Sequence, residues 1–403
     1  MPTTTLAPPP GTNGDLDLDA IVDATPAHRD RTVDAARALC IVVVVLWHWV
    51  FSITHVSGGG ALTMPNPIDE IPAGWLVTWV LQVMPAFFVV GGFANLASWQ
   101  RLEREAQARA ARADGGGGRA GEQRATWRTY AAGRMARLWK PLAAVVVVWG
   151  VGDTIARVVL DVPSVVSWGI VVFVPLWFLA AYSAVLLLAP VTIRAHRRHP
   201  LGTLVALGAG IAAFDALRFT TGEDRWGYAT TALVWVAAHQ LGYLWRDGTV
   251  TGWTRRAQAG LVAGAAATLA VLTTVGPYPA SMVAVRGGGI SNMFPTTAPI
   301  AVLAVLQLGL IALVRPAAER WLARRGPWRA VVAVNAVAMT VFAWHMTALV
   351  AVIGAAQGLG LELPATTSAT WWLLRPVWLV LPGIVLAGLV GMFARLERVR
   401  LVP

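Results

Sequence analysis

The chain is short of charge and of cysteine, and each shortage excludes a class of protein. Of its 403 residues, 13% are charged, whereas a soluble domain carries about 25%. Too few polar side chains remain to cover a surface in water, and 56% of the residues are hydrophobic. The single cysteine, Cys40, excludes an internal disulfide and any metal site built from several cysteines. These features indicate a polytopic membrane protein.

The N-terminal segment has neither the basic nor the apolar part of a signal peptide. It is rich in Pro, Thr, Gly and Asp, a composition that cannot bury enough apolar surface to fold. We therefore predict a disordered cytoplasmic tail over residues 1–33 and a short cytoplasmic tail over residues 395–403.

Ten stretches of mostly apolar residues have the length of a membrane-spanning helix, about 20 residues. We expect an all-α fold, a polytopic membrane helical bundle of about ten transmembrane helices, formed by a domain at 34–394. The expected spans are 36–56, 74–99, 135–160, 168–193, 201–219, 227–245, 258–276, 298–315, 330–354 and 371–393.

Basic residues alternate between the connections and give the expected orientation. The net charge is +11, and all but five of the 32 Lys and Arg residues lie in or beside connections on one side. By the positive-inside rule that side is cytoplasmic, together with both termini. Because topology explains the charge, a nucleic-acid partner is not expected. The five exceptions are Arg157, Arg218, Arg225, Arg286 and Arg375.

The longest cytoplasmic connection, 100–133, begins with helix-forming residues of mixed charge and continues into Asp-Gly-Gly-Gly-Gly. This pattern predicts a solvated helix followed by a flexible linker.

The first expected span carries polar residues along one face. Arg37 and His48 are eleven residues apart, about three helical turns and roughly 16 Å along the axis, and Asp34 falls near the same stripe. Ionisable side chains inside a membrane face the bundle interior or a wet cavity. We expect Arg37 and His48 to share a water-accessible groove. Taken alone, this helix favours a structural interpretation, with Arg37 as an interfacial anchor and His48 as a packing residue.

A second basic cluster opens the third expected span. Arg134 and Arg137 are one turn apart, and their forked guanidinium groups suit phosphate oxygens. Taken alone, the pair is typical of a cytoplasmic helix end.

Together these motifs resemble those of a known family. Asp34-Ala-Ala-Arg37, followed after ten residues by His48, resembles the opening motif of the acyltransferase-3 family of integral-membrane acyltransferases, and Arg134-x-x-Arg137 resembles its Arg-x-x-Arg element. Three further segments are similar to family elements in the same order: 84–93, with Gly91 in place of the usual serine, then 175–190 and 342–350. The chain departs from the family after Trp177, where the glutamate pair of many members is absent.

The resemblance implies transfer of an acyl group, acetyl or another short chain, from cytoplasmic acyl-CoA to a hydroxyl. The acceptor would be a glycan, a lipid-linked molecule or a small molecule. Acyl-CoA, for example acetyl-CoA, would then be a co-substrate, with no bound cofactor. The implied location is the bacterial plasma membrane, as a multi-pass protein.

The site residues follow from the same comparison. We predict His48 as the general base that takes the proton of the acceptor hydroxyl. Arg37, Arg134 and Arg137 are predicted to bind acyl-CoA. Candidates for lining the pocket are Asp34, Trp177 and His345. No His-Glu-x-x-His spacing occurs, so no metal is expected.

An alternative class, a secondary transporter or flippase, also needs polar residues on helix faces. Such proteins often have repeated halves, and the two halves of this chain differ in charge placement and loop pattern. Among the remaining histidines, we expect His196 and His199 to be solvated in a cytoplasmic loop and His239 to line a cavity or bridge helices.

Overall fold

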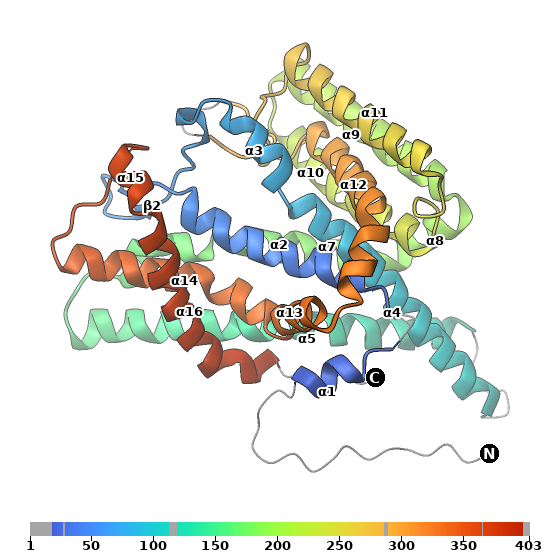
Figure 1. The fold of residues 1–403 in the computed structure, drawn as a ribbon, viewed down its shortest axis with the longest axis horizontal. Coiled ribbons are helices and arrows are strands. Elements are labelled where there is room, and N and C mark those ends of the chain that lie inside the picture. The colour runs from blue at the N-terminus through green and yellow to red at the C-terminus, as the bar shows by residue number, and fades with distance from the viewer. Residues whose placement is uncertain (1–17, 27–28, 113–118, 286–288, 365, 398–403) are drawn as a thin grey trace.

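Helices make up 77% of the structure, a computed structural model shown in Figure 1. It describes residues 18–26, 29–112, 119–285, 289–364 and 366–397. One antiparallel hairpin pairs β1 (His55–Val56) with β2 (Leu62–Thr63). The short helices are α1 (Leu18–Asp23), η1 (Ile68–Glu70), α3 (Gly74–Leu81), the π-helix η2 (Ile155–Val159), α6 (Val165–Trp168), η3 (Ile170–Phe173) and α15 (Ala369–Leu373). The longer helices are α2 (Arg31–Val50), α4 (Met84–Arg112), α5 (Arg119–Thr154), α7 (Leu176–Leu187), α8 (Ala189–Arg198), α9 (Pro200–Thr221), α10 (Arg225–Arg246), α11 (Arg255–Thr274), α12 (Ala298–Leu322), α13 (Arg325–Ala336), α14 (Ala338–Gly358) and α16 (Arg375–Glu397).

Nine helical segments of the described residues are long and apolar enough to cross a membrane. They correspond to nine of the ten expected spans. The tenth, α10, has 22 residues but is less apolar, because it contains side chains such as Thr230, His239 and Gln240. These three are buried, so α10 presents them to other helices and not to lipid. The fold is the expected polytopic helical bundle.

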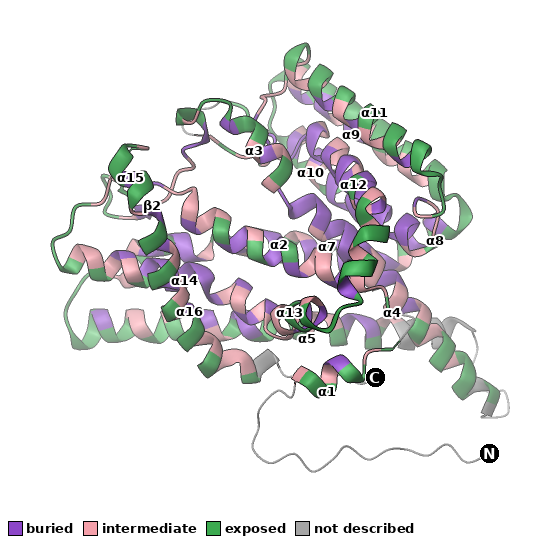
Figure 2. Ribbon diagram, in the orientation of Figure 1, coloured by how far each residue is buried: buried purple, intermediate pink, exposed green. Residues whose placement is uncertain are grey.

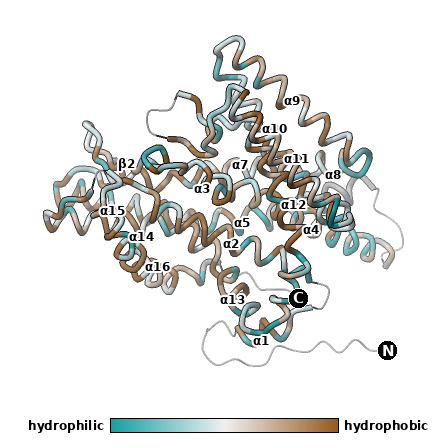
Figure 3. Tube along the Cα trace, turned by 45° about the horizontal axis from the view of Figure 1, so that its top comes forward, coloured by the Kyte–Doolittle hydropathy of each residue, from teal (hydrophilic) through white to brown (hydrophobic). Residues whose placement is uncertain are grey.

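Large apolar side chains cover the outside of the bundle. Val205 on α9 is 72% exposed, and Val271 on α11 is 58% exposed. Figure 2 shows these two helices with long exposed stretches, and Figure 3 shows apolar residues along them. Such a surface is unfavourable in water and is suited to lipid.

Helix α2 lies between two packed groups of helices (Figure 1). Its start is fixed by Asp30, whose side chain accepts hydrogen bonds from the backbone N–H groups of Thr32 and Val33. Ile41 packs in the cluster formed with α4, α7, α10 and α12, whereas Trp49 packs in the cluster formed with α14 and α16. The polar face of α2 is therefore enclosed by neighbouring helices.

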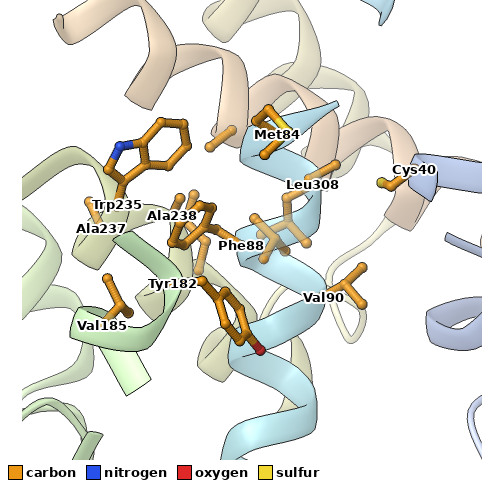
Figure 4. Close-up of a cluster of buried hydrophobic side chains, with 14 of the residues drawn as sticks. Cys40, Met84, Phe88, Val90, Tyr182, Val185, Trp235, Ala237, Ala238 and Leu308 are labelled. Atoms are coloured by element: carbon orange, nitrogen blue, oxygen red, sulfur yellow. The ribbon is translucent and has the colours of Figure 1, made fainter. Parts of the chain in front are cut away.

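Helices α4 and α10 approach closely because glycines face each other. A Cβ atom on Gly92 would overlap the carbonyl oxygen of His239, and one on Gly242 would overlap the carbonyl oxygen of Val89. A Cβ on Gly91 would meet the ring of Tyr182. Figure 4 shows the apolar cluster at this contact, with Phe88 and Tyr182 beside α4. Close backbone packing at small residues is a usual source of stability between membrane helices.

Four of the expected continuous spans are interrupted. The second breaks at Gln82, between α3 and α4; the fourth divides into η3, α7 and α8; the ninth breaks at Val337, between α13 and α14. The tenth also breaks near its start, at Leu374 between α15 and α16. Pro85 contributes to the first break, since it has no N–H to donate to the preceding turn. The break at Gln82 adjoins the candidate site described below.

Part of the expected disordered tail is ordered, so that prediction is corrected for its second half. Helix α1 packs on α13, where Trp328 donates a hydrogen bond to Thr25 Oγ1 (3.0 Å) and Arg325 pairs with Asp19 and Asp23. These contacts supply a folding surface that the composition of the tail alone does not contain. Residues 1–17 of the tail lie outside the described residues.

The connection at 100–133 is also more helical than expected. The predicted solvated helix is a continuation of α4 to Arg112, and α5 already begins at Arg119. The Gly-rich stretch 113–118 lies outside the described residues. At the C-terminus α16 continues to Glu397, and 398–403 are not described.

Candidate active site

His48 lies in the last turn of α2 and contacts two groups through one ring nitrogen. Its Nδ1 is 2.9 Å from the carbonyl oxygen of Val44 and 3.1 Å from Nε2 of His345. His48 is half-buried, and it forms part of the wall of a cavity.

His345 lies directly behind His48 on α14 and is fully buried. Its Nδ1 is 2.7 Å from the carbonyl oxygen of Phe342, and its own carbonyl accepts a hydrogen bond from Trp49 Nε1 (3.1 Å). The two imidazole rings are tilted by 39° with their centroids 5.1 Å apart. Two helices that are far apart in sequence thus bring a histidine pair together.

The cavity beside His48 has a volume of about 450 Å³. It lies toward the expected outer face, because the outer connections 51–73 and 275–297 contribute to its wall. Trp177 and Phe178 form part of the same wall, and none of the described residues that line it has a charged side chain, His48 being taken as neutral. The lining residues are Val44, Trp47, His48, Phe51, Ser52, 64–66, 81–84, 174–175, Trp177, Phe178, 283–285, Met293 and Phe342.

Gln82 holds one wall of this cavity in place. Its Oε1 accepts from the N–H of Met84 (3.1 Å), and its carbonyl accepts from Gln307 Nε2 (2.7 Å). Its Nε2 donates to the carbonyl of Met282 (3.4 Å) and contacts Met293 Sδ (3.3 Å). Gln82 thereby satisfies backbone groups freed by the break between α3 and α4, and it ties the outer connection 275–297 to that break.

The three predicted acyl-CoA-binding arginines gather at the expected cytoplasmic half. Arg37 and Arg134 are within range of mutual electrostatic interaction, as are Arg134 and Arg137. Arg134 donates to the carbonyl of Ala94 (2.8 Å) and to Ser98 Oγ, which fixes its guanidinium on α4. Arg137 is exposed on the same side of α5.

Asp34 organises the entrance to α2. It accepts from Arg29 Nε (2.6 Å) and pairs with Arg37 Nη1 (3.5 Å). The hydrogen bond to Asp34 raises the pKa of Arg29, which precedes the helix. Asp34 itself is 5% exposed.

Some expectations about these residues need correction. Of the three candidates for lining the pocket, Trp177 lines the cavity, whereas Asp34 pairs with arginines and His345 lies behind the wall. The cavity also does not reach Arg37. Between Arg37 and His48, Cys40 and neighbouring α2 side chains pack into the hydrophobic core. Cys40 Sγ contacts the carbonyl of Val83 (3.8 Å) and is buried. The expected continuous groove is absent from this part of the described structure.

Two buried polar networks join helices, and in the first of them His239 bridges helices, one of the two roles expected for it. Asn95 Nδ2 lies 2.8 Å from Nε2 of His239 and 3.4 Å from the hydroxyl of Tyr182, which links α4, α7 and α10. His196, expected to be solvated, is 2% exposed and lies between Asp247 Oδ2 (2.6 Å) and Gln240 Nε2 (2.7 Å). A basic loop composition hid the fact that α8 carries His196 against α10.

No group of three or more His, Cys, Asp or Glu side chains is arranged to hold a metal ion among the described residues.

Comparison with known proteins gives one match. Residues 30–394 match a family, acyltransferase 3, that is described as an acyltransferase domain. No curated protein and no solved structure matched the chain. The match spans α2 to α16 and so includes both the histidine pair and the arginine cluster.

Proposed function

Because the chain belongs to the acyltransferase-3 family, it is a membrane acyltransferase, and we propose that it uses acyl-CoA as the donor. The acyl group, acetyl or another short chain, passes to a hydroxyl of a glycan, a lipid-linked molecule or a small molecule. The proposed location is the bacterial plasma membrane. The observation that carries the proposal is His48 in the wall of a cavity lined mainly by apolar and aromatic described residues, on the same helix as Arg37.

His48 acts as the general base in this proposal. The hydroxyl oxygen of the acceptor attacks the carbonyl carbon of the thioester while its proton passes to Nε2 of His48. The carbon–sulfur bond breaks, the acyl group stays on the acceptor oxygen, and the CoA thiolate takes the proton from His48. General base catalysis contributes about 10²–10⁴-fold, and holding the two substrates together contributes further.

Arg37, Arg134 and Arg137 bind the phosphates of CoA at the cytoplasmic side. Arg134 lies within electrostatic range of both Arg37 and Arg137, and the repulsion between these cations in the free protein favours a polyanion beside them. His48 lies about 16 Å from Arg37 along the helix axis. A donor whose phosphates bind at Arg37 therefore has to extend over this distance for its thioester end to reach the cavity. Donor binding must therefore part α2 from α4 near Cys40, where Cys40 Sγ contacts the carbonyl of Val83.

The cavity wall supports an uncharged reacting group. Apolar and aromatic side chains surround a few polar ones, a composition typical of small-molecule sites. Trp177 lies in this wall beside Phe178 and is placed to contact the acyl chain or the acceptor.

The test compares His48→Ala with His55→Ala, a histidine that is exposed on β1 and lines no part of the cavity. Membranes that contain each variant at equal level are supplied with acetyl-CoA, and CoA release is followed with mass spectrometry of surface glycans, lipids and secreted metabolites. We expect His48→Ala to lose transfer by about 10²–10⁴-fold and His55→Ala to retain it. Transfer by His48→Ala at the wild-type rate would exclude His48 as the base.

A further inference from the structure

The contacts of the histidine pair determine which nitrogens carry hydrogen. In a neutral imidazole one nitrogen donates and the other accepts. Nδ1 of His345 faces the carbonyl oxygen of Phe342 at 2.7 Å, and Nδ1 of His48 faces the carbonyl oxygen of Val44 at 2.9 Å. A carbonyl oxygen only accepts, so each Nδ1 must carry its hydrogen.

The opposite assignment fails at both rings. If Nε2 of His345 donated to His48, Nδ1 of each ring would turn a lone pair toward a carbonyl oxygen at hydrogen-bond distance. At His345, which is fully buried, no solvent would relieve that repulsion. With both Nδ1 atoms protonated, Nε2 of His345 holds a lone pair 3.1 Å from the N–H of His48 and accepts from it.

We propose that His345 is a positioning residue for His48, an inference that rests on the proposed role of His48 as the base. Nδ1–H of His48 is shared between the carbonyl of Val44 and Nε2 of His345. This leaves the lone pair on Nε2 of His48, the nitrogen that is free to receive the hydroxyl proton. The histidine of the base is thereby held in one tautomer and one ring orientation.

The same contact acts during the reaction. When Nε2 of His48 takes the hydroxyl proton, the ring becomes an imidazolium, and its Nδ1–H becomes a charged donor. Hydrogen bonds to a charged group are stronger than those between neutral groups. His345 is neutral with its lone pair already directed at this donor, so it stabilises the charge without moving.

The pair of variants His345→Gln and His345→Asn separates this role from a packing role. A glutamine amide reaches the position of Nε2 and can still accept from His48, whereas an asparagine amide reaches only the position of Nδ1 and the carbonyl of Phe342. Both remove the ring and leave a buried polar side chain. If His345 served packing alone, the two variants would lose activity to a similar extent.

Turnover is measured on full-length protein in membranes, with radiolabelled acetyl-CoA as donor and the membranes of the producing cell as the source of acceptor. We expect His345→Asn to lower kcat about 10–100-fold with KM for acetyl-CoA unchanged. We expect His345→Gln to stay within about fivefold of wild type, because a neutral acceptor is retained. Equal losses in the two variants, or a change confined to KM, would overturn the proposal.

A second measurement does not depend on activity. Nitrogen-15 NMR of histidine-labelled protein in lipid nanodiscs, with His48 assigned by comparison with His48→Gln, reports which ring nitrogen is protonated. We expect His48 to be protonated at Nδ1 and free at Nε2, and a proton on Nε2 contradicts the inference. If His48→Ala retains transfer while the spectrum shows the expected tautomer, the catalytic role fails but the pairing stands.

Discussion

Single polar side chains inside this bundle keep their positions because each is bound by a neighbour within the protein. Gln82 binds the freed backbone groups of a broken span, and Arg134 is fixed by Ala94 and Ser98 on α4. Arg137 differs, since it is exposed at the same end of the bundle, the end predicted to be cytoplasmic. It is therefore the arginine of the cluster whose removal disturbs the fold least and reports most directly on donor binding.

Arg137→Gln should raise KM for acyl-CoA about 10–100-fold and leave kcat nearly unchanged, because it removes one charge-assisted contact to a phosphate. The effect should weaken as salt concentration rises, since screening already reduces the attraction. Steady-state kinetics at two salt concentrations measure both. Arg256→Gln, at an exposed position of α11 on the predicted cytoplasmic side, is the matched control. An equal change in both variants would mean that only the overall charge matters.

At this scale the sequence predicts residue types better than partners. The spacing of Arg37 and His48 is by itself enough to place both on one face of α2. The contact between His48 and His345 joins positions 297 apart, and nothing in either helix alone predicts it. For His196 the prediction itself was wrong. The basic loop around it predicted an exposed side chain, but His196 is buried between Asp247 and Gln240.

Pairs of helices depend on how near their backbones can approach. Gly92 and Gly242 allow α4 and α10 to touch at backbone distance, which in turn brings Asn95 and His239 within hydrogen-bonding range. A methyl group at either glycine meets backbone atoms, which cannot turn aside as a side chain can.

Gly92→Ala and Gly242→Ala should each destabilise the protein, and by at least the 1–3 kcal/mol that overpacking typically costs. Gly208→Ala on α9 and Gly260→Ala on α11 are matched controls, since an added Cβ there meets nothing within 4 Å. The better helix propensity of alanine should make the controls neutral or slightly stabilising. Thermal unfolding in detergent, followed by loss of the monodisperse species, compares the four. Controls that melt as early as Gly92→Ala would show that α4 and α10 are not packed this way.

Hydropathy predicts the existence of spans but not their interruptions. Apolarity is the same whether a segment is one helix or two, so 74–99 has the pattern of a single span although it breaks at Gln82. The clue in the sequence is a glutamine three residues before Pro85 within an otherwise apolar run. The docking of α1 was missed for a related reason, because Trp328 and Arg325 lie far along the chain from the tail they bind.

The whole molecule is asymmetric across the membrane. The predicted cytoplasmic end of α4 lies toward the lower right of Figure 1 and α8 lies at its right side, whereas β2 and α15 lie at the left and α3 lies toward the top. The arginine cluster is at the first end, and the cavity beside His48 is nearer the second. If the basic side is cytoplasmic, the donor approaches from the side where acyl-CoA is made and the acceptor can enter from the other.

Thiol labelling tests this orientation, and the composition of the chain makes the experiment simple. Cys40 is the single cysteine and is buried, so Cys40→Ala provides a background without thiols. Glu105→Cys and Arg256→Cys mark the predicted cytoplasmic side, and His55→Cys and Glu362→Cys mark the outer side, all at exposed positions.

In intact cells a membrane-impermeant maleimide should label the cysteines at 55 and 362 and spare those at 105 and 256. After the cells are permeabilised, all four should react, which controls for buried or blocked thiols. Labelling of Glu105→Cys in intact cells would reverse the orientation. The arginine cluster would then face away from the cytoplasmic pool of acyl-CoA, and donor binding by Arg37, Arg134 and Arg137 could not stand.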